Sequence, residues 1–243
     1  MRNPKWHRDE IILALDLYFD KKLGSIDSGN PKIIELSELL NRLPIFTHKP
    51  DQDKFRNPNG VTLKLSNFQA LDPNYKGKGM MAHSKLDKEV FEEFCSDVNR
   101  LHQIANGIRQ VSNNIEISNA VSRIENDETS ETDSVKEGQV LYKLHKVRER
   151  DRKIVEAKKK NVLKDKGELK CEACDFDFEK KYGQMGKGYI ECHHLIPLSN
   201  FQTTKETKLD DLAMLCSNCH RMIHKDLNVR TIKEFKSKWG VKG

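Results

Sequence analysis

Four cysteines in the C-terminal part of the chain stand in two C-x-x-C pairs, Cys171 with Cys174 and Cys216 with Cys219. Each pair can place two sulfur atoms on one edge of a tetrahedron, so two pairs can close a site around Zn²⁺ across the 41 residues between them. Paired cysteines in a non-secreted chain of this size bind metal more often than they form disulfides, and no thioredoxin-like pattern favours a redox pair. The spacing therefore predicts a structural zinc site with four sulfur ligands and no open position.

Four histidines lie among these cysteines: His193 is adjacent to His194, and His220 precedes His224 by four residues. Adjacent side chains of a strand point to opposite faces, whereas residues four apart share one face of a helix. Imidazole binds divalent metals, and its near-neutral pKa suits a general base. The residues alone leave open whether His220 or His224 replaces a cysteine at the zinc, although four cysteines already suffice.

Three stretches carry a family resemblance: CEAC at 171–174, ECHHLIPLS at 191–199 and LDDLAMLCSNCHRMIH at 209–224. They resemble the HNH (ββα-metal) nuclease motif in the version with two zinc-binding C-x-x-C pairs. Residues 138–226 resemble the nuclease part of McrA-like, modification-dependent restriction endonucleases. The resemblance implies an enzyme that hydrolyses phosphodiesters with one catalytic divalent metal, Mg²⁺ or Mn²⁺, beside the structural zinc.

The resemblance also implies a role for each histidine. His194 takes the position of the general base that activates the attacking water. His193 and His224 match metal-ligand positions, and His220 joins them or contacts phosphate. The family usually has Asn in the middle of the motif, where this chain has Asp211. Because Asp can accept the same hydrogen bond, the resemblance implies that Asp211 orients His194.

Helical patterns precede these motifs. Apolar periodicity and capping residues predict helices at 8–22, 31–43 and 60–71, a further helix from Ser84 that reaches Leu101, and a short closing helix at 231–240. Ser84 is followed three residues later by Asp87, which is the pattern of a capping box. We therefore expect residues 1–105 to form one compact, mostly helical domain.

Basic charge is concentrated in the last part of the chain. Residues 106–137 carry 3 basic and 7 acidic side chains and few apolar ones, which predicts a flexible linker. Residues 138–243 carry 24 basic and 15 acidic side chains, which favours a polyanionic partner such as DNA over a merely solvated surface. A long basic helix is predicted over 137–167, leading into the last domain. The predicted class is α+β, with a helical N-terminal domain and a ββα-metal domain at 138–243.

The N-terminal domain resembles the sulfur-binding domains that read phosphorothioate DNA and occur fused to HNH nucleases, over segments 55–73 and 79–87. A phosphorothioate carries one soft, poorly hydrated sulfur, so its reader needs a shallow apolar dimple and cations for the neighbouring phosphates. Two polar loops, 48–59 and 72–83, together with the residues beside them, contain apolar side chains for such a dimple and basic side chains for the phosphates. The candidate DNA-binding residues are Phe55, Arg56, Asn57, Pro58, Lys64, Tyr75, Lys76, Lys78, His83, Ser84 and Lys85.

Three other functions stay open at this point: an HNH enzyme directed to 5-methylcytosine, an HNH enzyme of homing or phage-packaging type, and a non-catalytic zinc-stabilised DNA-binding protein. Flipping a methylated base needs an aromatic cage, and only 7% of the residues are aromatic, which favours the phosphorothioate reader. One HNH site makes one nick, so cleavage of double-stranded DNA predicts a homodimer, or two molecules that meet on the DNA. No run approaches the roughly 20 apolar residues of a membrane span, and no signal peptide begins the chain, so we expect a cytoplasmic protein without a membrane partner.

Overall fold

The computed structural model describes residues 2–46, 48–80, 82–124, 138–149, 151–195, 207–225, 229 and 231–241. These residues divide into two compact units. The N-terminal unit contains the chain up to Arg123 together with Gly138–Leu141, and the C-terminal unit contains the described residues from Tyr142 onward. Among the described residues, no helix has the length and apolar character needed to cross a bilayer.

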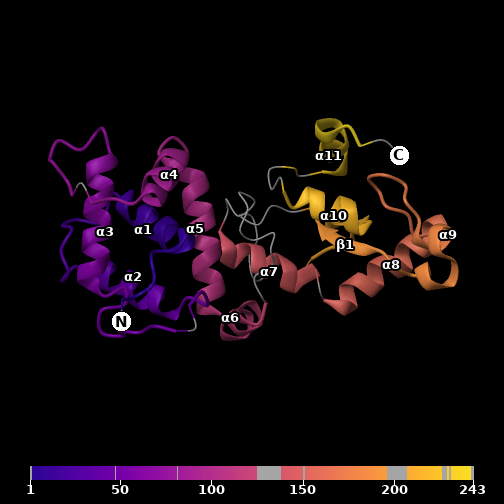
Figure 1. The fold of residues 1–243 in the computed structure, drawn as a ribbon, viewed down its shortest axis with the longest axis horizontal. Helices are drawn as coiled ribbons and strands as arrows, with labels where there is room; N and C mark the ends of the chain where they lie inside the picture. The colour runs from indigo at the N-terminus through magenta and orange to yellow at the C-terminus, as the bar shows by residue number, and fades with distance from the viewer. Residues whose placement is uncertain are drawn as a thin grey trace. The chain divides into compact units, whose positions relative to one another are not determined.

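Helix α1 (Arg8–Tyr18) lies at the centre of the N-terminal unit, surrounded by other helices (Figure 1). Its side chains from Asp9 to Leu17 are all buried, which explains why apolar residues occur on every side of this helix. Four helices pack against α1: α2 (Pro31–Arg42), α3 (Pro58–Leu71), α4 (Lys85–Phe94) and α5 (Val98–Asn113).

Two of the predicted helices differ in length from the observed ones, because short polar side chains bond to the backbone. The helix predicted over 8–22 ends at Tyr18, and the carboxylate of Asp20 accepts a hydrogen bond from the backbone N–H of Lys22 in the turn that follows. The helix that begins after Ser84 ends at Phe94. Asp97 then caps a new helix, α5, by accepting from the N–H of Arg100.

Helical structure continues beyond residue 105. Helix α5 runs to Asn113, and Asn114 caps a further helix, α6 (Ile115–Ser122), by accepting from the N–H of Ile117. This part of the segment 106–137 is therefore helical, whereas its composition predicts a linker. The rest of that expectation, for 125–137, lies outside the described residues.

The long basic helix predicted over 137–167 is divided into α7 (Gln139–Glu149) and α8 (Arg152–Lys166). Asp151 begins the second of these helices, since its side chain accepts from the N–H of Lys153. Gly167 ends α8 with the left-handed backbone that glycine adopts without strain. A capping residue inside the basic run thus separates two helices that hydropathy alone does not distinguish.

The C-terminal unit is built on two antiparallel strands, β1 (Glu191–His194) and β2 (Leu212–Leu215), with His193 opposite Ala213 and His194 opposite Leu212. Short elements surround the pair, namely α9 (Phe178–Tyr182), the 3₁₀ helices Gly183–Gly186 and Leu209–Asp211, α10 (Ser217–Ile223) and α11 (Ile232–Trp239). Few strands and many helices confirm the predicted α+β class.

The two faces of this sheet have separate cores. Ala213 and Leu215 pack with the paired cysteines, with Ile223 of α10 and with Phe235 of α11. Leu212 and Met214 point to the other face and pack with residues that include Val162 of α8. Because paired residues of an antiparallel sheet share a face, His193 lies on the α10 side and His194 on the α8 side.

Candidate metal centres

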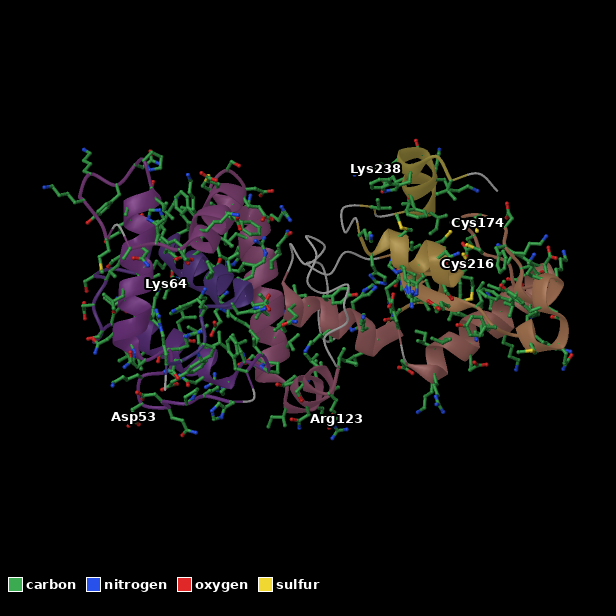
Figure 2. The ribbon with its side chains drawn as sticks, in the orientation of Figure 1. Asp53, Lys64, Arg123, Cys174, Cys216 and Lys238 are labelled. Atoms are coloured by element: carbon green, nitrogen blue, oxygen red, sulfur yellow. The ribbon has the colours of Figure 1, made fainter. Side chains whose placement is uncertain are left out.

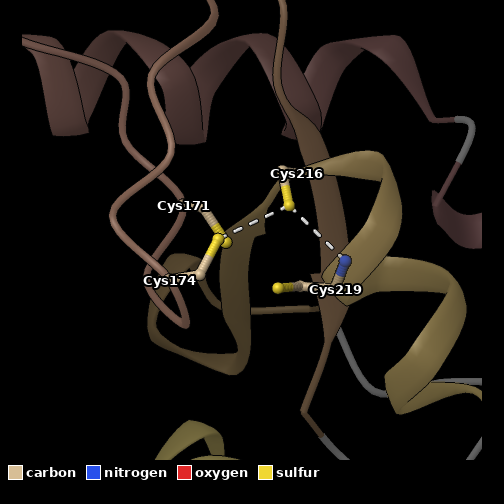
Figure 3. A group of neighbouring side chains, drawn as sticks. All are labelled: Cys171, Cys174, Cys216 and Cys219. Carbon is tan, nitrogen blue, oxygen red and sulfur yellow. Dashed lines mark hydrogen bonds between the residues drawn. The ribbon is translucent and has the colours of Figure 1, made fainter. Parts of the chain in front are cut away.

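The four paired cysteines lie together, as the spacing predicts (Figure 3). Their sulfur atoms are all within 4.8 Å of one another, with 3.7 Å between the sulfurs of Cys174 and Cys216, and none of them forms a disulfide. Figure 2 shows the same two cysteines side by side within the C-terminal unit. Four sulfurs at these separations fit the ligand set of a tetrahedral Zn²⁺.

Local backbone bonds build this site. The N–H of Cys171 donates to the carbonyl of Phe176 (2.9 Å), which folds the first pair into a tight turn. The N–H of Glu172 donates to Met214 (2.8 Å), and its carboxylate accepts from the Met214 N–H (2.9 Å), which ties that turn to β2. Cys216 directly follows β2 and is the N-cap of α10. The second cysteine pair therefore lies beside the first.

Burial of the cysteines disfavours their ionised, metal-binding form unless a cation lies between them. Burial raises the pKa of Cys171 to about 11 and also raises the pKa of Cys219. At Cys216 burial is outweighed by hydrogen bonds from Cys219, which lower the pKa. Several thiols this close cannot all ionise unless a positive charge lies among them, and Zn²⁺ supplies such a charge.

A second group of metal-binding side chains lies on the α10 side of the strands. One atom from each of His145, Glu149, His193 and His224 lies within 4.8 Å of all the others. The carboxylate oxygen Oε1 of Glu149 is 2.6 Å from His145 Nε2, 2.9 Å from His193 Nδ1 and 3.4 Å from His224 Nε2. These side chains come from α7, from β1 and from the residue that ends α10.

His220 contacts the same group and is held by two carboxylates. Its Nε2 lies 2.9 Å from Oε1 of Glu149, and its Nδ1 lies 2.6 Å from Oε2 of Glu191. Burial opposes a charge on this ring, but the hydrogen bonds to Glu149 and Glu191 outweigh burial and raise its pKa to about 9. His220 is therefore the positively charged member of the group.

The rings of His193 and His224 are neutral. Burial lowers the pKa of His193 to about 3 and lowers that of His224, despite the nearby carboxylate. Burial favours the protonated form of Glu149, yet the histidines around it, His145 first, hold its pKa well below the usual range. Neutral imidazoles and an ionised carboxylate are the forms that bind a divalent cation, so these residues fit one.

His194 lies next to this group. It is buried, its ring centroid is 5.7 Å from that of His145, and its ring bonds to the backbone of Arg148. Burial lowers its pKa to about 4, so it is neutral and able to accept a proton. The register that places His193 and His194 on opposite faces agrees with the different roles expected for them.

Asp211 contacts the strand end beside His194 through its backbone. Its carbonyl accepts from the N–H of Leu195 (2.8 Å), the residue after His194. Its carboxylate accepts from the backbone N–H of Lys208 (3.0 Å) and so caps the 3₁₀ helix that begins there. The observed bond of this carboxylate is thus a local one, and its orienting action on His194 stays a prediction.

Three candidate DNA-binding residues of the N-terminal unit differ from expectation, because the structure buries them. Phe55 is in the core, and the guanidinium of Arg56 forms two bonds to the buried carboxylate of Glu10 (2.7 and 2.8 Å). The ammonium of Lys64 lies 2.6 Å from the buried carboxylate of Asp87, among the helices (Figure 2). These side chains hold the unit together and are not at its surface.

The other candidates are nearer the surface. Asn57 and Ser84 are N-caps of α3 and α4, Pro58 occupies the first position of α3, and His83 is half-buried. Exposed positions in or beside the second loop are occupied by Tyr75, Lys76, Lys78 and Lys85.

His145 and Glu149 are the site residues that the sequence patterns missed. They are four residues apart within the predicted basic helix, so they share one helix face, and both side chains are at most 8% exposed. The pattern around them predicts only a basic helix. The i, i+4 spacing of an imidazole and a carboxylate is the signal that could have identified them.

Comparison with known proteins supports the interpretation of the C-terminal unit. Residues 171–226 match the sequence model of the family HNH, described as HNH endonuclease. The chain carries an HNH domain. Comparison with curated proteins and with solved structures finds no match. The matched segment contains the four cysteines and His193, His194, His220 and His224, whereas His145 and Glu149 precede it.

Proposed function

We propose that this protein is a metal-dependent DNA endonuclease whose HNH domain hydrolyses phosphodiester bonds. The observation that carries the proposal is the pair of distinct ligand groups in one small unit. The four sulfurs form a closed set suited to a structural Zn²⁺, and the group of imidazoles with a carboxylate can hold a second divalent cation, which we propose to be a catalytic Mg²⁺ or Mn²⁺. A protein that only binds DNA has no need of the second group.

His194 acts as the general base in this proposal. Its ring is neutral and lies beside His145, at the edge of the ligand group, so it can take a proton from a water that attacks phosphorus. When bound, the divalent cation polarises the phosphate and stabilises the leaving oxygen. His220, whose two nitrogens face Glu149 and Glu191, contacts a phosphate oxygen in its charged form, or joins the ligands once it has lost its proton.

The N-terminal unit directs the nuclease to modified DNA in this proposal, and phosphorothioate is the modification we favour. Support comes from the loop 72–83, where Tyr75, Lys76 and Lys78 are exposed. The loop is held against α3: the N–H of Met80 donates to the carbonyl of Ser66, and a Cβ at Gly79 (φ +56°) would lie 2.3 Å from the backbone of α3. A loop held in this way can present an apolar ring and two cations without ordering on binding.

The test is a cleavage assay with Mg²⁺ or Mn²⁺ on three otherwise identical DNAs: unmodified, bearing 5-methylcytosine, and bearing phosphorothioate. Cleavage of the phosphorothioate DNA alone is the expected result. Cleavage of the methylated DNA alone would keep the nuclease and replace the reader. Equal cleavage of all three would leave an HNH enzyme without modification dependence, and no cleavage of any would leave a DNA-binding protein.

Double-strand cleavage by a single HNH site requires two copies on the DNA, so the proposal includes a homodimer. Sedimentation of the protein alone and with a cleavable duplex measures its state directly. A monomer in both conditions, together with double-strand cuts, would overturn this part of the proposal.

A further inference from the structure

Two side chains of α7 enter the metal-binding group from outside the HNH-matched segment. His145 and Glu149 are one helical turn apart, and their side chains are 4% and 8% exposed. The matched segment begins 22 positions after Glu149, at Cys171. The histidines of the HNH motif therefore meet two potential ligands that the motif itself does not contain.

More imidazole nitrogens surround Oε1 of Glu149 than one carboxylate oxygen can accept hydrogen bonds from. Four imidazole nitrogens lie 2.6 to 3.4 Å from Oε1, which has two lone pairs. Nε2 of His224 also lies 3.0 Å from Nε2 of His220, so at most one of these two nitrogens points a proton at the other. Hydrogen bonds alone do not satisfy this arrangement.

The donors of the rings lead to the same conclusion. Each neutral imidazole donates through one nitrogen, and Oε1 of Glu149 can accept at most two of the four N–H groups that could face it. A ring that does not donate turns a nitrogen lone pair toward the carboxylate, which is unfavourable. Nδ1 of His224 is buried without a hydrogen-bond partner, which shows that protonation does not satisfy this ring fully. A divalent cation among these atoms would turn opposed lone pairs into ligands.

We propose that His145 and Glu149 of α7 complete the catalytic metal site, binding the same cation as His193 and His224. The inference rests on the proposed nuclease function and deepens it. Three imidazole nitrogens and one carboxylate oxygen leave two positions of a six-coordinate Mg²⁺ or Mn²⁺ open for water and phosphate. A four-coordinate Zn²⁺ would be filled by the same ligands, so zinc at this site is expected to block the substrate.

The experiment measures Mn²⁺ binding by isothermal titration calorimetry and by electron paramagnetic resonance, on full-length protein loaded with zinc. The variants are Glu149→Gln and His145→Gln. Glu156→Gln in α8 and His102→Gln in α5 are matched controls, because their side chains are 73% and 65% exposed and lie outside the group. Zinc content and the thermal transition of each variant report whether the C-terminal unit has folded.

We expect one Mn²⁺ per wild-type chain and a loss of affinity of about 100-fold or more in Glu149→Gln, since losing even an indirect partner of a ligand costs about 10- to 100-fold. In His145→Gln, the nitrogen couplings in the resonance signal should decrease by one histidine. The two controls should bind Mn²⁺ as the wild type does.

Wild-type affinity in folded Glu149→Gln, or unchanged nitrogen couplings in His145→Gln, would overturn the inference and leave the nuclease proposal intact. If the wild type itself bound no Mn²⁺ and cleaved no DNA, the proposed function would fail instead. If Glu149→Gln loses its zinc or its folding transition, its Mn²⁺ affinity no longer tests the inference. The comparison of nitrogen couplings between the wild type and His145→Gln is then the test.

Discussion

At the scale of single residues, a basic side chain can serve either a DNA contact or an internal ion pair. Arg56 and Lys64 are cations of the kind that contact phosphate, yet each neutralises a buried carboxylate. The ring of Trp6 lies 4.7 Å from the guanidinium of Arg56 and 4.8 Å from the ammonium of Lys64. Residue type alone does not separate a DNA contact from an internal ion pair, because both need a positive charge.

His194→Ala should lower the rate of DNA cleavage by about 10²- to 10⁴-fold, the usual contribution of a general base. DNA affinity should not change, because the metal ligands and the N-terminal unit are intact. Single-turnover cleavage and fluorescence anisotropy measure the two quantities. His102→Ala, at an exposed position of α5, is the control. A cleavage rate within twofold of wild type would exclude His194 as the base.

Arg56→Ala should destabilise the N-terminal unit by about 3–5 kcal/mol, because it leaves the carboxylate of Glu10 buried without its cation. Lys76→Ala should leave stability unchanged, since Lys76 is exposed, and should weaken DNA binding. Urea unfolding and DNA titration distinguish the two effects. A stable Arg56→Ala protein that fails only in DNA binding would contradict the structural role.

At the scale of elements, capping residues decide where the helices of this chain begin. Ser84 and Asp87 form the predicted capping box of α4, and Thr231 with Glu234 forms another at α11. Asp151 acts in the same way and divides the predicted basic helix into two. Caps depend on neighbours within three residues, which is why sequence patterns identify them well.

Ser84→Ala should lower the free energy of unfolding of the N-terminal unit by about 1 kcal/mol, because the N–H of Asp87 loses its acceptor. Ser96→Ala, at an exposed position between α4 and α5, should change it by less than about 0.5 kcal/mol. Urea midpoints of the two variants give the comparison. Equal destabilisation by both would show that the cap does not stabilise α4.

At the scale of the whole molecule, the two units are stabilised by different means. The N-terminal unit has a continuous helical core around α1 with ion pairs inside it. The C-terminal unit has two short strands and small cores on either side of them. We expect a unit with so little apolar interior to depend on a bound metal for much of its folding free energy.

Cys216→Ser should abolish stoichiometric zinc binding and unfold the C-terminal unit, while the N-terminal unit keeps its own transition. Elemental analysis and differential scanning calorimetry measure these outcomes. Cys95→Ser is the matched control, because Cys95 is exposed and stands apart from the cluster. A Cys216→Ser protein with both transitions unchanged would show that zinc is not what holds this unit together.

Features that depend on short spacing could be predicted from the sequence. These are the two cysteine pairs, the opposite facing of the two adjacent histidines and the capping box at the start of α4. The sequence did not predict the division of the helices at Asp97 and Asp151. A side-chain cap there competes with continued helix, and the outcome depends on packing.

Contacts between residues that are far apart in the sequence become visible only in the folded protein. Glu149 reaches His193 from 44 positions away, and Arg56 reaches Glu10 from 46, so no local spacing records either pair. These groups lose their water only when the chain folds and brings them together. Desolvation then makes the group around Glu149 suited to a cation, and makes Arg56 and Glu10 an internal ion pair. The cysteine pairs are also distant from each other, but each half is a local motif, and that is why the sequence could identify them.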